Sequence, residues 1–386
     1  MAEAQARIAL LHYWLLGMRG GEKVVEELCT LFPNADIFTH VCNPERISAA
    51  ISRHRIFETG ISRLPGARRS CQKYLPLMFA ALRKLDLGNY DLLISSESGP
   101  AKGIRKPPGV PHICYCHTPM RYLWDLYDEY RRSAGPGARL AMCLFRERLR
   151  RLDRASAEAV DHFIANSRFV AERIFRIYHR DAEVIHPPVD TEFYSSVRRV
   201  PGEYYLFAGQ LIPYKHPELA VEACRRLGRP LVVVGEGPMR PQLEELAAGG
   251  NVTFAGRVSD EALRRYYAGA RALLFPGCED FGIVPVEAQA AGTPVIALGR
   301  GGALETVRGG ETGLFFQEST VDALIGAMLR FEAEGDWDEA LCRANAEQFS
   351  RAEFRRKFRQ FVREKTGVEI AVSASGLSGA SAPGRR

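Results

Sequence analysis

Short apolar runs alternate with charged, helix-like segments along the chain, and this alternation restarts once near the middle. The first series of strand-like runs is Arg7–Tyr13, Ala35–His40, Tyr90–Ser95, His112–Cys116, His162–Ala165 and Ala182–Ile185. The second is Tyr204–Ala208, Leu231–Gly235, Val252–Ala255, Ala272–Phe275, Pro294–Ala297 and Gly313–Phe315. Strands that alternate with helices favour a parallel sheet covered on both faces. The pattern therefore predicts an α/β chain with two doubly wound, Rossmann-like halves.

A Pro-, Ser- and Gly-rich segment without a clear period separates the two series at residues 186–203, and we expect a linker there. A chain of 386 residues is long enough for two domains. We expect an N-terminal, acceptor-side domain at residues 1–190 and a donor-binding domain at 200–350. A last helix within 351–367 is expected to return to the N-terminal domain. The Ser/Gly/Ala-rich tail at 371–386 is predicted to be disordered.

Composition restricts the location and the partners of the chain. The net charge is +6, but no nucleic-acid-binding motif accompanies it, so we expect no nucleic-acid partner. Nine cysteines lack regular spacing, and the N-terminus lacks the pattern of a cleaved leader. These features predict a cytoplasmic protein, with any membrane contact peripheral and on the inner face. Cys114 and Cys116 are expected to be buried strand residues, not metal ligands.

The stretch Arg53–Lys84 mixes Arg and Lys with Ile, Phe, Leu, Tyr and Met. Two interpretations remain open for it. In the first interpretation, the stretch lies on an anionic membrane surface, with its basic groups at the headgroups. Alternatively, it forms an amphipathic helix pair that packs on its own domain.

The most informative segment is ALLFPGCEDFGIVPVEAQAAGTPVIA, residues 272–297. It predicts a strand, a loop with two acidic residues, and a helix whose first residue is Pro285. The backbone N–H groups of Gly282, Ile283 and Val284 should converge at that helix N-terminus, where a diphosphate binds favourably. Glu279 and Glu287 lie on either side of this expected anion site.

The spacing Glu279…Glu287 (E-x7-E), with the following GTPVIA, the GEGP turn and Lys215, resembles glycosyltransferase family 4 over about residues 6–365. Within the family, the chain resembles bacterial GDP-mannose-dependent mannosyltransferases of O-antigen and exopolysaccharide assembly. The resemblance implies the GT-B fold, in which two Rossmann-like domains face a central cleft. It also implies retention of configuration at the anomeric carbon, a nucleotide diphosphate sugar as donor substrate, and no required metal or other cofactor.

The resemblance assigns donor contacts to the second half of the chain. It implies that Lys215 and an arginine five residues earlier bind the donor diphosphate, but Gln210 stands at the arginine position. Glutamine can donate a hydrogen bond but brings no charge. The remaining expected donor contacts are Gly235 at a turn, Arg257 and Val258 near the base, Phe281, Gly282, Ile283 and Val284 along the loop, Glu279 at the sugar hydroxyls and Glu287 at the ribose.

In the first half, Gly20 and Gly21 open the first helix, and the resemblance places their loop near the diphosphate and the acceptor. A plain tight turn is the alternative, because no Walker or Rossmann glycine fingerprint occurs there. The resemblance also places His117 near the transferred sugar, where a neutral imidazole can contact a hydroxyl or the developing charge. We therefore expect Glu279, His117 and Lys215 to be the catalytic groups.

Further polar residues of the first half follow strand ends and are candidate acceptor contacts. They are Ser95, Ser96, Glu97, Arg121 and Asp125. Asn166 and Ser167 match a family pattern after the strand at residues 162–165.

The expected reaction is transfer of a hexose, in particular mannose from GDP-mannose, onto a glycan or lipid-linked saccharide. A UDP-sugar-dependent hexosyltransferase of the same fold is an alternative. A phosphorylase or nucleotide-sugar epimerase shares this architecture, and the departure at Gln210 leaves a non-catalytic nucleotide-sugar-binding subunit as a further alternative.

Overall fold

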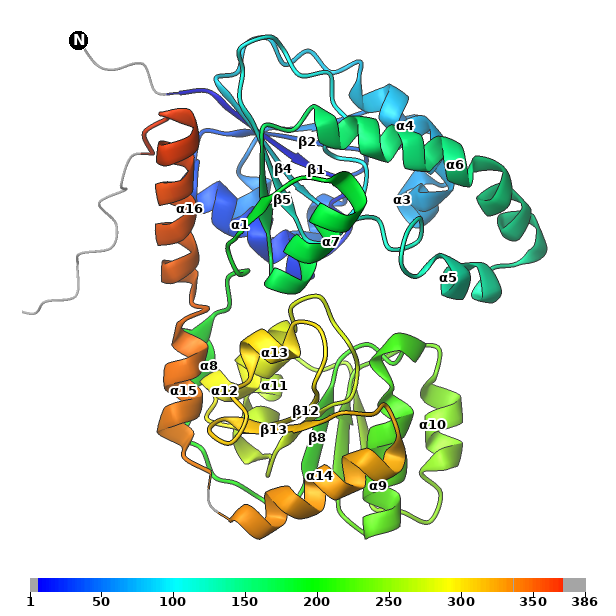
Figure 1. Ribbon diagram of the computed structural model, residues 1–386, viewed down its shortest axis with the longest axis vertical. Coiled ribbons are helices and arrows are strands. Elements are labelled where there is room, and N and C mark those ends of the chain that lie inside the picture. The colour runs from blue at the N-terminus through cyan, green and yellow to red at the C-terminus, as the bar shows by residue number, and fades with distance from the viewer. Residues whose placement is uncertain (1–5, 336, 371–386) are drawn as a thin grey trace, which may run out of the picture.

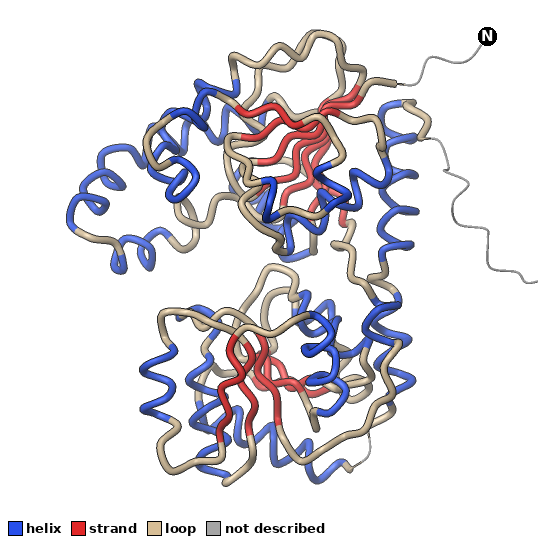
Figure 2. The backbone as a smooth tube through the Cα atoms, turned by 180° about the vertical axis from the view of Figure 1, so that it is seen from behind, coloured by secondary structure: helices blue, strands red, loops and turns tan. Residues whose placement is uncertain are grey.

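The computed structural model describes residues 6–370, except residue 336 and the side chain of Ser133. The predicted disordered tail, 371–386, lies outside the described residues. The chain forms two α/β domains, one above the other in Figure 1, and each contains a parallel sheet with helices on its faces. The view from behind shows two separate sheets, one in each domain (Figure 2). The predicted fold class is therefore confirmed.

The first domain contains a seven-stranded parallel sheet of order β3-β2-β1-β4-β5-β6-β7. Its strands are β1 Ile8–His12, β2 Asp36–Thr39, β3 Ile56–Glu58, β4 Leu92–Glu97, β5 His112–Cys116, β6 His162–Ala165 and β7 Ala182–Val184. Its helices are α1 Gly20–Leu31, α2 Ala49–Ser52, α3 Ala67–Ser70, α4 Leu75–Leu82, α5 Tyr127–Ser133, α6 Pro136–Glu158 and α7 Arg168–Tyr178, with 3-10 turns η1 Pro44–Arg46, η2 Gly60–Arg63 and η3 Cys71–Tyr74.

The second domain contains a six-stranded parallel sheet of order β10-β9-β8-β11-β12-β13. Its strands are β8 Tyr205–Ala208, β9 Leu231–Val234, β10 Val252–Gly256, β11 Leu273–Phe275, β12 Val295–Leu298 and β13 Gly313–Phe316. The remaining helices are α8 Thr191–Ser195, α9 Pro217–Leu227, α10 Arg240–Leu246, α11 Asp260–Gly269, α12 Ile283–Ala290, α13 Ala303–Thr306, α14 Val321–Glu334, α15 Glu339–Glu347 and α16 Arg351–Thr366, with the 3-10 turn η4 Pro213–Lys215.

Two details of the predicted organisation were wrong. The three-residue edge strand β3 was missed, because its alternation is too short to be distinguished from a loop. The segment 186–203 is not a plain linker, since it contains α8 and its Val189 pairs with Ser350. Tyr194 of α8 is buried with the core of the second domain, so this connection is packed in place.

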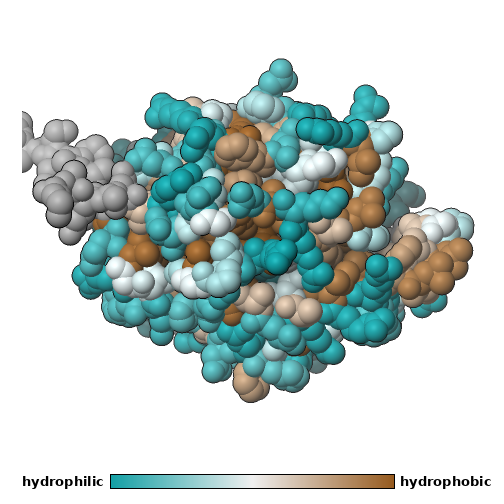
Figure 3. Space-filling model, turned by 90° about the horizontal axis from the view of Figure 1, so that it is seen from above, coloured by the Kyte–Doolittle hydropathy of each residue, from teal (hydrophilic) through white to brown (hydrophobic). Residues whose placement is uncertain are grey.

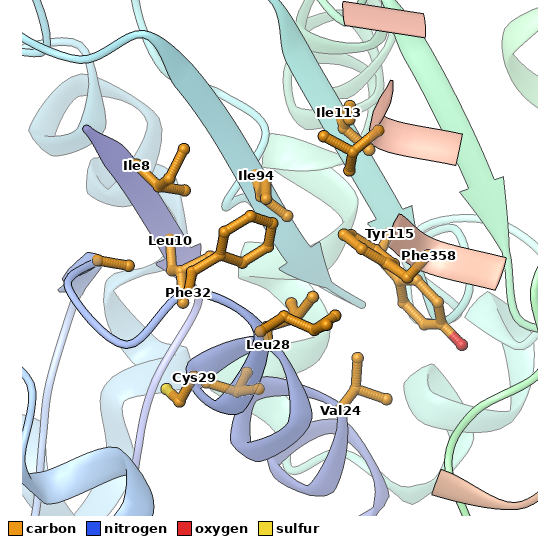
Figure 4. Close-up of a cluster of buried hydrophobic side chains, with 14 of the residues drawn as sticks. Ile8, Leu10, Val24, Leu28, Cys29, Phe32, Ile94, Ile113, Tyr115 and Phe358 are labelled. Atoms are coloured by element: carbon orange, nitrogen blue, oxygen red, sulfur yellow. The ribbon is translucent and has the colours of Figure 1, made fainter. Parts of the chain in front are cut away.

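The helix α16 carries the end of the chain back to the first domain, where it lies beside α1 (Figure 1). The buried side chains of Phe354, Phe358 and Phe361 join the cluster that contains Val24 and Leu28 of α1. Figure 4 shows Phe358 together with these two residues of α1. Burial of each large apolar side chain stabilises a fold by about 1.5–3 kcal/mol. The two domains are therefore connected by a second chain segment, which packs in the core of the first domain.

The stretch Arg53–Lys84 is divided among short helices and turns that pack on a small cluster including Val41, Ile61 and Met78. It is thus a packed part of its own domain, although Leu77 points outward and is 52% exposed. Cys114 and Cys116 are buried in β5, as predicted. Within the described residues, no helix combines the length and the apolar character that a membrane span requires.

Candidate functional site

An ion pair lies at the carboxyl ends of β8 and β11 in the second domain. Nζ of Lys215, at the end of η4, is 2.8 Å from Oε1 of Glu279, in the loop after β11. Burial lowers the pKa of Lys215, but the Glu279 carboxylate raises it further, so the net shift is upward. Both side chains are only partly accessible, at 14% and 18%. Ligands of open parallel sheets bind at this end of the strands, and the structure brings these two predicted residues together there.

Glycines allow the loops around this pair to approach one another closely. A Cβ at Gly277 would lie 2.8 Å from Cα of Lys215. At Gly235 a Cβ would lie 1.8 Å from the carbonyl oxygen of Gly209, and Gly235 has a φ of 134°. Gly235 is therefore required by the packing of the loops after β8 and β9, whatever else it contacts.

The helix α12 begins at Ile283, two residues before the predicted start. Gly282 has a φ of 85° and turns the loop into the helix, so Pro285 is the third helical residue and the prediction that it comes first was wrong. Ile283 and Val284 have N–H groups at this N-terminus, whereas Pro285 has none. The positive end of the helix dipole faces the same region.

Phe281, a predicted donor contact, is 3% exposed. Its ring lies against those of His186 and Phe349, with centroids 5.4 Å and 5.5 Å away. The side chain is therefore part of the core, and only the backbone of residue 281 remains for a ligand. Arg257 is exposed and Val258 half-buried beyond β10, and Gln210 is exposed after β8.

Glu287 of α12 is buried and already has partners. Its Oε2 accepts a hydrogen bond from the Tyr267 hydroxyl at 3.0 Å, and its Oε1 lies 3.2 Å from Nζ of Lys23. Lys23 belongs to α1 of the first domain, and the Glu287 carboxylate raises its pKa. Lys23 was not among the predicted site residues. Its position in GGEK, three residues after Gly20 at a helix start, is the signal that could have drawn attention to it.

The N-terminus of α1 meets the N-terminus of α12 across the domain boundary. A Cβ at Gly20 would lie 2.9 Å from Cδ1 of Ile283. A Cβ at Gly21 would lie 3.5 Å from Nε2 of His117 and 3.6 Å from Cε1 of His12. The predicted glycine loop, His117 and the α12 loop are thus adjacent, with two positive helix ends at one place.

A small polar group surrounds His117. Nε2 of His117 is 2.9 Å from Oγ of Ser96. Burial, and to a smaller extent the nearby His12, lowers the pKa of His117 to about 3. Nδ1 of His12 is 2.7 Å from the Ser96 carbonyl oxygen, and its Nε2 is 3.8 Å from Glu22. His117 is therefore a neutral imidazole at ordinary pH. His12 and Glu22 were not predicted as site residues. In the sequence, His12 is a single histidine at the end of a strand, and Glu22 is an acidic residue of the kind common in the first turn of a helix.

Two of the predicted acceptor residues have other roles. Ser95 is fully buried and its Oγ is 2.9 Å from Nε2 of His112 in the next strand. Glu97 accepts hydrogen bonds from both the backbone N and Nζ of Lys102, and Lys102 also pairs with Asp153. This buried network stabilises the first domain, so the acceptor assignment of Ser95 and Glu97 was wrong.

Asp280, next to Glu279, is the centre of a network between the domains. Its carboxylate pairs with Arg121 and, at 2.7 Å, with Nη1 of Arg173, both from the first domain. Ser167 donates a hydrogen bond to the Asp280 carbonyl oxygen at 2.6 Å.

Other predicted residues complete this network. Asp125 is 2.5 Å from Nε of Arg173 and 2.8 Å from Arg176. Asn166 lies beside Ser167, with its Oδ1 3.1 Å from the Ser167 hydroxyl. Arg121 and Asp125 thus contribute to the domain contact that positions the loop carrying Glu279.

Two family models match the chain, one on each domain. The model described as Glycosyltransferase Family 4 matches residues 18–193, and the model described as Glycosyl transferases group 1 matches residues 190–349. The first domain thus matches a family 4 glycosyltransferase model and the second a group 1 glycosyl transferase model, and the two domains have the GT-B fold.

Among curated proteins, a D-inositol 3-phosphate glycosyltransferase from Nocardioides sp. is 34% identical over 269 residues, 59% of this chain and 56% of that protein. A protein of the same name from Mycobacterium sp. (strain KMS) is 32% identical over 180 residues, 40% of this chain and 41% of that protein. The chain thus spans about half the length of these relatives, and neither of the two is named as a GDP-mannose-dependent enzyme.

Three solved structures share the fold at low identity. A sucrose-phosphate synthase from Thermosynechococcus elongatus has a TM-score of 0.71 at 21% identity, covering 95% of this chain and 100% of its own. A lipopolysaccharide outer core galactosyltransferase has a TM-score of 0.68 at 18% identity, covering 93% and 99%. Anabaena HepE, in complex with UDP and glucose, has a TM-score of 0.68 at 16% identity, covering 93% and 99%.

Proposed function

We propose that this protein is a retaining hexosyltransferase that transfers mannose from GDP-mannose onto a glycan or lipid-linked saccharide in polysaccharide biosynthesis. The observation that carries the class of reaction is the Lys215–Glu279 pair beside the N-terminus of α12. A cation and free N–H donors suit a diphosphate, and a neighbouring carboxylate suits sugar hydroxyls. Glu287, 3.0 Å from Tyr267, is the ribose contact.

In the proposed reaction, the bond between the anomeric carbon and the donor phosphate oxygen breaks, and the oxygen keeps the electron pair. The acceptor hydroxyl forms its bond to the anomeric carbon on the same face and passes its proton to the leaving phosphate. Lys215 and the N–H groups of Ile283 and Val284 stabilise the negative charge of the diphosphate. Glu279 holds sugar hydroxyls, and neutral His117 contacts the sugar from the first domain. In this proposal the protein groups alone stabilise the leaving diphosphate, and no metal ion or further cofactor is required.

Lys23 completes the phosphate clamp. Gln210 leaves the clamp without the guanidinium expected five residues before Lys215, and Lys23 is a cation at the adjoining N-terminus of α1. When the ribose hydroxyls take over Glu287, the Lys23 ammonium moves from that carboxylate to the diphosphate. The charge missing from the second domain is then supplied by the first.

The donor is tested by thermal shifts with GDP, UDP, ADP and CDP, because a ligand that binds only the folded state raises the unfolding midpoint. The proposal expects the largest shift with GDP, followed by GDP release from GDP-mannose when acceptor is added. No shift with any of the four nucleotides would overturn the assignment of the site.

A UDP-sugar donor is the second candidate. It is favoured by the solved complex of HepE with UDP and glucose, which has the same fold. A shift with UDP that exceeds the shift with GDP would replace the first candidate by this one. The resemblance to the family puts the exposed Arg257 and the half-buried Val258 near the nucleotide base, so they are the positions to substitute next.

A further inference from the structure

An arm of the first domain carries apolar side chains into solvent. It consists of α5 and the first half of α6, residues 127–148, and it projects from the domain beside the gap between the two domains (Figure 1). Leu140 is 62% exposed, Leu144 is 69% exposed and Phe145 is 37% exposed. The view from above shows a brown, apolar projection at its far right, on the side of this arm (Figure 3). Leu140 and Leu144 are one helical turn apart and share a face.

The same arm is basic. Residues 127–148 contain five arginines and three acidic residues. The exposed arginines of the arm are Arg131, Arg132, Arg139 and Arg148. An apolar helix face bordered by arginines suits the boundary between anionic headgroups and acyl chains.

The arm is folded in place, because several contacts hold it. Arg139 donates hydrogen bonds to the carbonyl oxygens of Arg131 and Arg132, at 3.0 Å and 2.6 Å. The guanidinium of Arg146 lies 3.9 Å from the centre of the Tyr127 ring. At the base of the arm, Leu149 is buried in a cluster with Phe79. The exposed leucines are therefore presented on an ordered helix.

The base of the arm is also connected to the site. Arg121, just before α5, pairs with Asp280 and lies over the Tyr214 ring at 5.4 Å. Tyr214 precedes Lys215 in η4. The base of the arm is therefore in contact with the loops that carry Lys215 and Glu279.

We propose that the α5–α6 arm docks on an anionic lipid surface, with Leu140, Leu144 and Phe145 inserted below the headgroups and the arginines among them. The proposal rests on the proposed function, since it gives a lipid-linked acceptor direct access to the cleft. It also changes the part of the chain expected to contact a membrane, because Arg53–Lys84 is largely packed on its own domain.

The test compares binding to vesicles of phosphatidylcholine alone and of phosphatidylcholine with phosphatidylglycerol. Wild-type protein is expected to sediment with the anionic vesicles, and 0.5 M NaCl should weaken this binding. The double variant Leu140→Ser/Leu144→Ser should lose at least tenfold in affinity. A matched control, Leu329→Ser/Leu341→Ser, removes leucines of 46% and 44% exposure from the second domain and should bind as wild type.

Cys143 reports on the arm directly, because among the nine cysteines it is the exposed one. A polarity-sensitive fluorophore on Cys143 should shift to the blue when anionic vesicles are added. Unchanged sedimentation of the leucine variant, or equal binding to neutral vesicles, would overturn the proposal. So would a dimer that dissociates in the leucine variant, because the face would then bind a second copy. Nucleotide thermal shifts of the variant separate this outcome from failure of the proposed function, since they depend only on the cleft.

Discussion

Nζ of Lys23 in the first domain lies 3.2 Å from Oε1 of Glu287 in the second domain. The pair joins the first turn of α1 to the middle of α12, and Glu287 is 5% exposed. A buried carboxylate needs such a partner, because an uncompensated charge in a protein interior is costly. A ribose that binds Glu287 must replace this ammonium, which links donor binding to the contact between the domains.

The first prediction concerns the charge supplied by Lys23. Lys23→Met should weaken nucleoside diphosphate binding about tenfold, which corresponds to about 1.4 kcal/mol. Gln210→Arg should recover most of this loss in the Lys23→Met background and add little to the wild type. Isothermal titration calorimetry measures all four dissociation constants. Tighter binding by Lys23→Met would show that Lys23 only blocks Glu287.

The second prediction concerns the domain contact at Asp280. Asp280→Asn removes the charge that Arg121 and Arg173 share, so the loop carrying Glu279 is held less firmly. We expect kcat to fall roughly tenfold to a hundredfold, with little change in nucleotide affinity. Glu311→Gln breaks the exposed pair with Arg308 and is the control. Equal kcat in Asp280→Asn and the control would contradict a positioning role.

The third prediction separates two glycines. Gly235→Ala places a Cβ 1.8 Å from the Gly209 carbonyl oxygen and should lower the free energy of unfolding by about 3 kcal/mol. Gly326→Ala, within α14, meets no atom within 4 Å and should raise it by up to about 1 kcal/mol. Urea unfolding measures the free energy of unfolding of both variants and of the wild type. A Gly235→Ala protein as stable as wild type would mean that the loops after β8 and β9 rearrange easily.

The fourth prediction concerns acid. Burial lowers the pKa of His112 from 6.5 to about 3, so the unfolded chain takes up this proton first as the pH falls. The free energy of unfolding should therefore decrease as the pH falls below about 6.5, by about 2 kcal/mol from His112 between pH 7 and 5. His112→Gln should reduce this slope when urea unfolding is measured at both pH values. An unchanged slope would show that His112 does not contribute to it.

The regular parts of the fold could be predicted because their signals are local. The strand at His112–Cys116 and the helix at Pro217–Leu227 have the predicted bounds, since each combines an apolar pattern with clear end signals. The start of α12 was predicted at Pro285 because proline favours a first helical turn. The left-handed Gly282 starts the helix earlier, and that conformation depends on packing that the local pattern does not contain.

The candidate site was predictable to the extent that its residues follow strand ends. Lys215, Glu279 and His117 were predicted from such positions together with the resemblance to glycosyltransferase family 4, and the structure places Lys215 beside Glu279. Lys23, His12 and Asp280 acquire their roles through partners far away in the chain, such as Glu287, 264 positions from Lys23. Ser95 and Glu97 lie in the last half of β4, but their side chains are bound to His112 and Lys102 in the interior of the first domain. Strand-end position identifies candidates, whereas tertiary contacts decide which of them face the cleft.

The central claim is that Glu279 holds the sugar of a nucleotide diphosphate donor during transfer. The most direct measurement is turnover of the matching donor with acceptor, by wild type and Glu279→Ala, with nucleotide thermal shifts to show an intact fold. We predict loss of transfer by at least a hundredfold, with the nucleotide shift retained. Near-normal transfer by Glu279→Ala would contradict the claim.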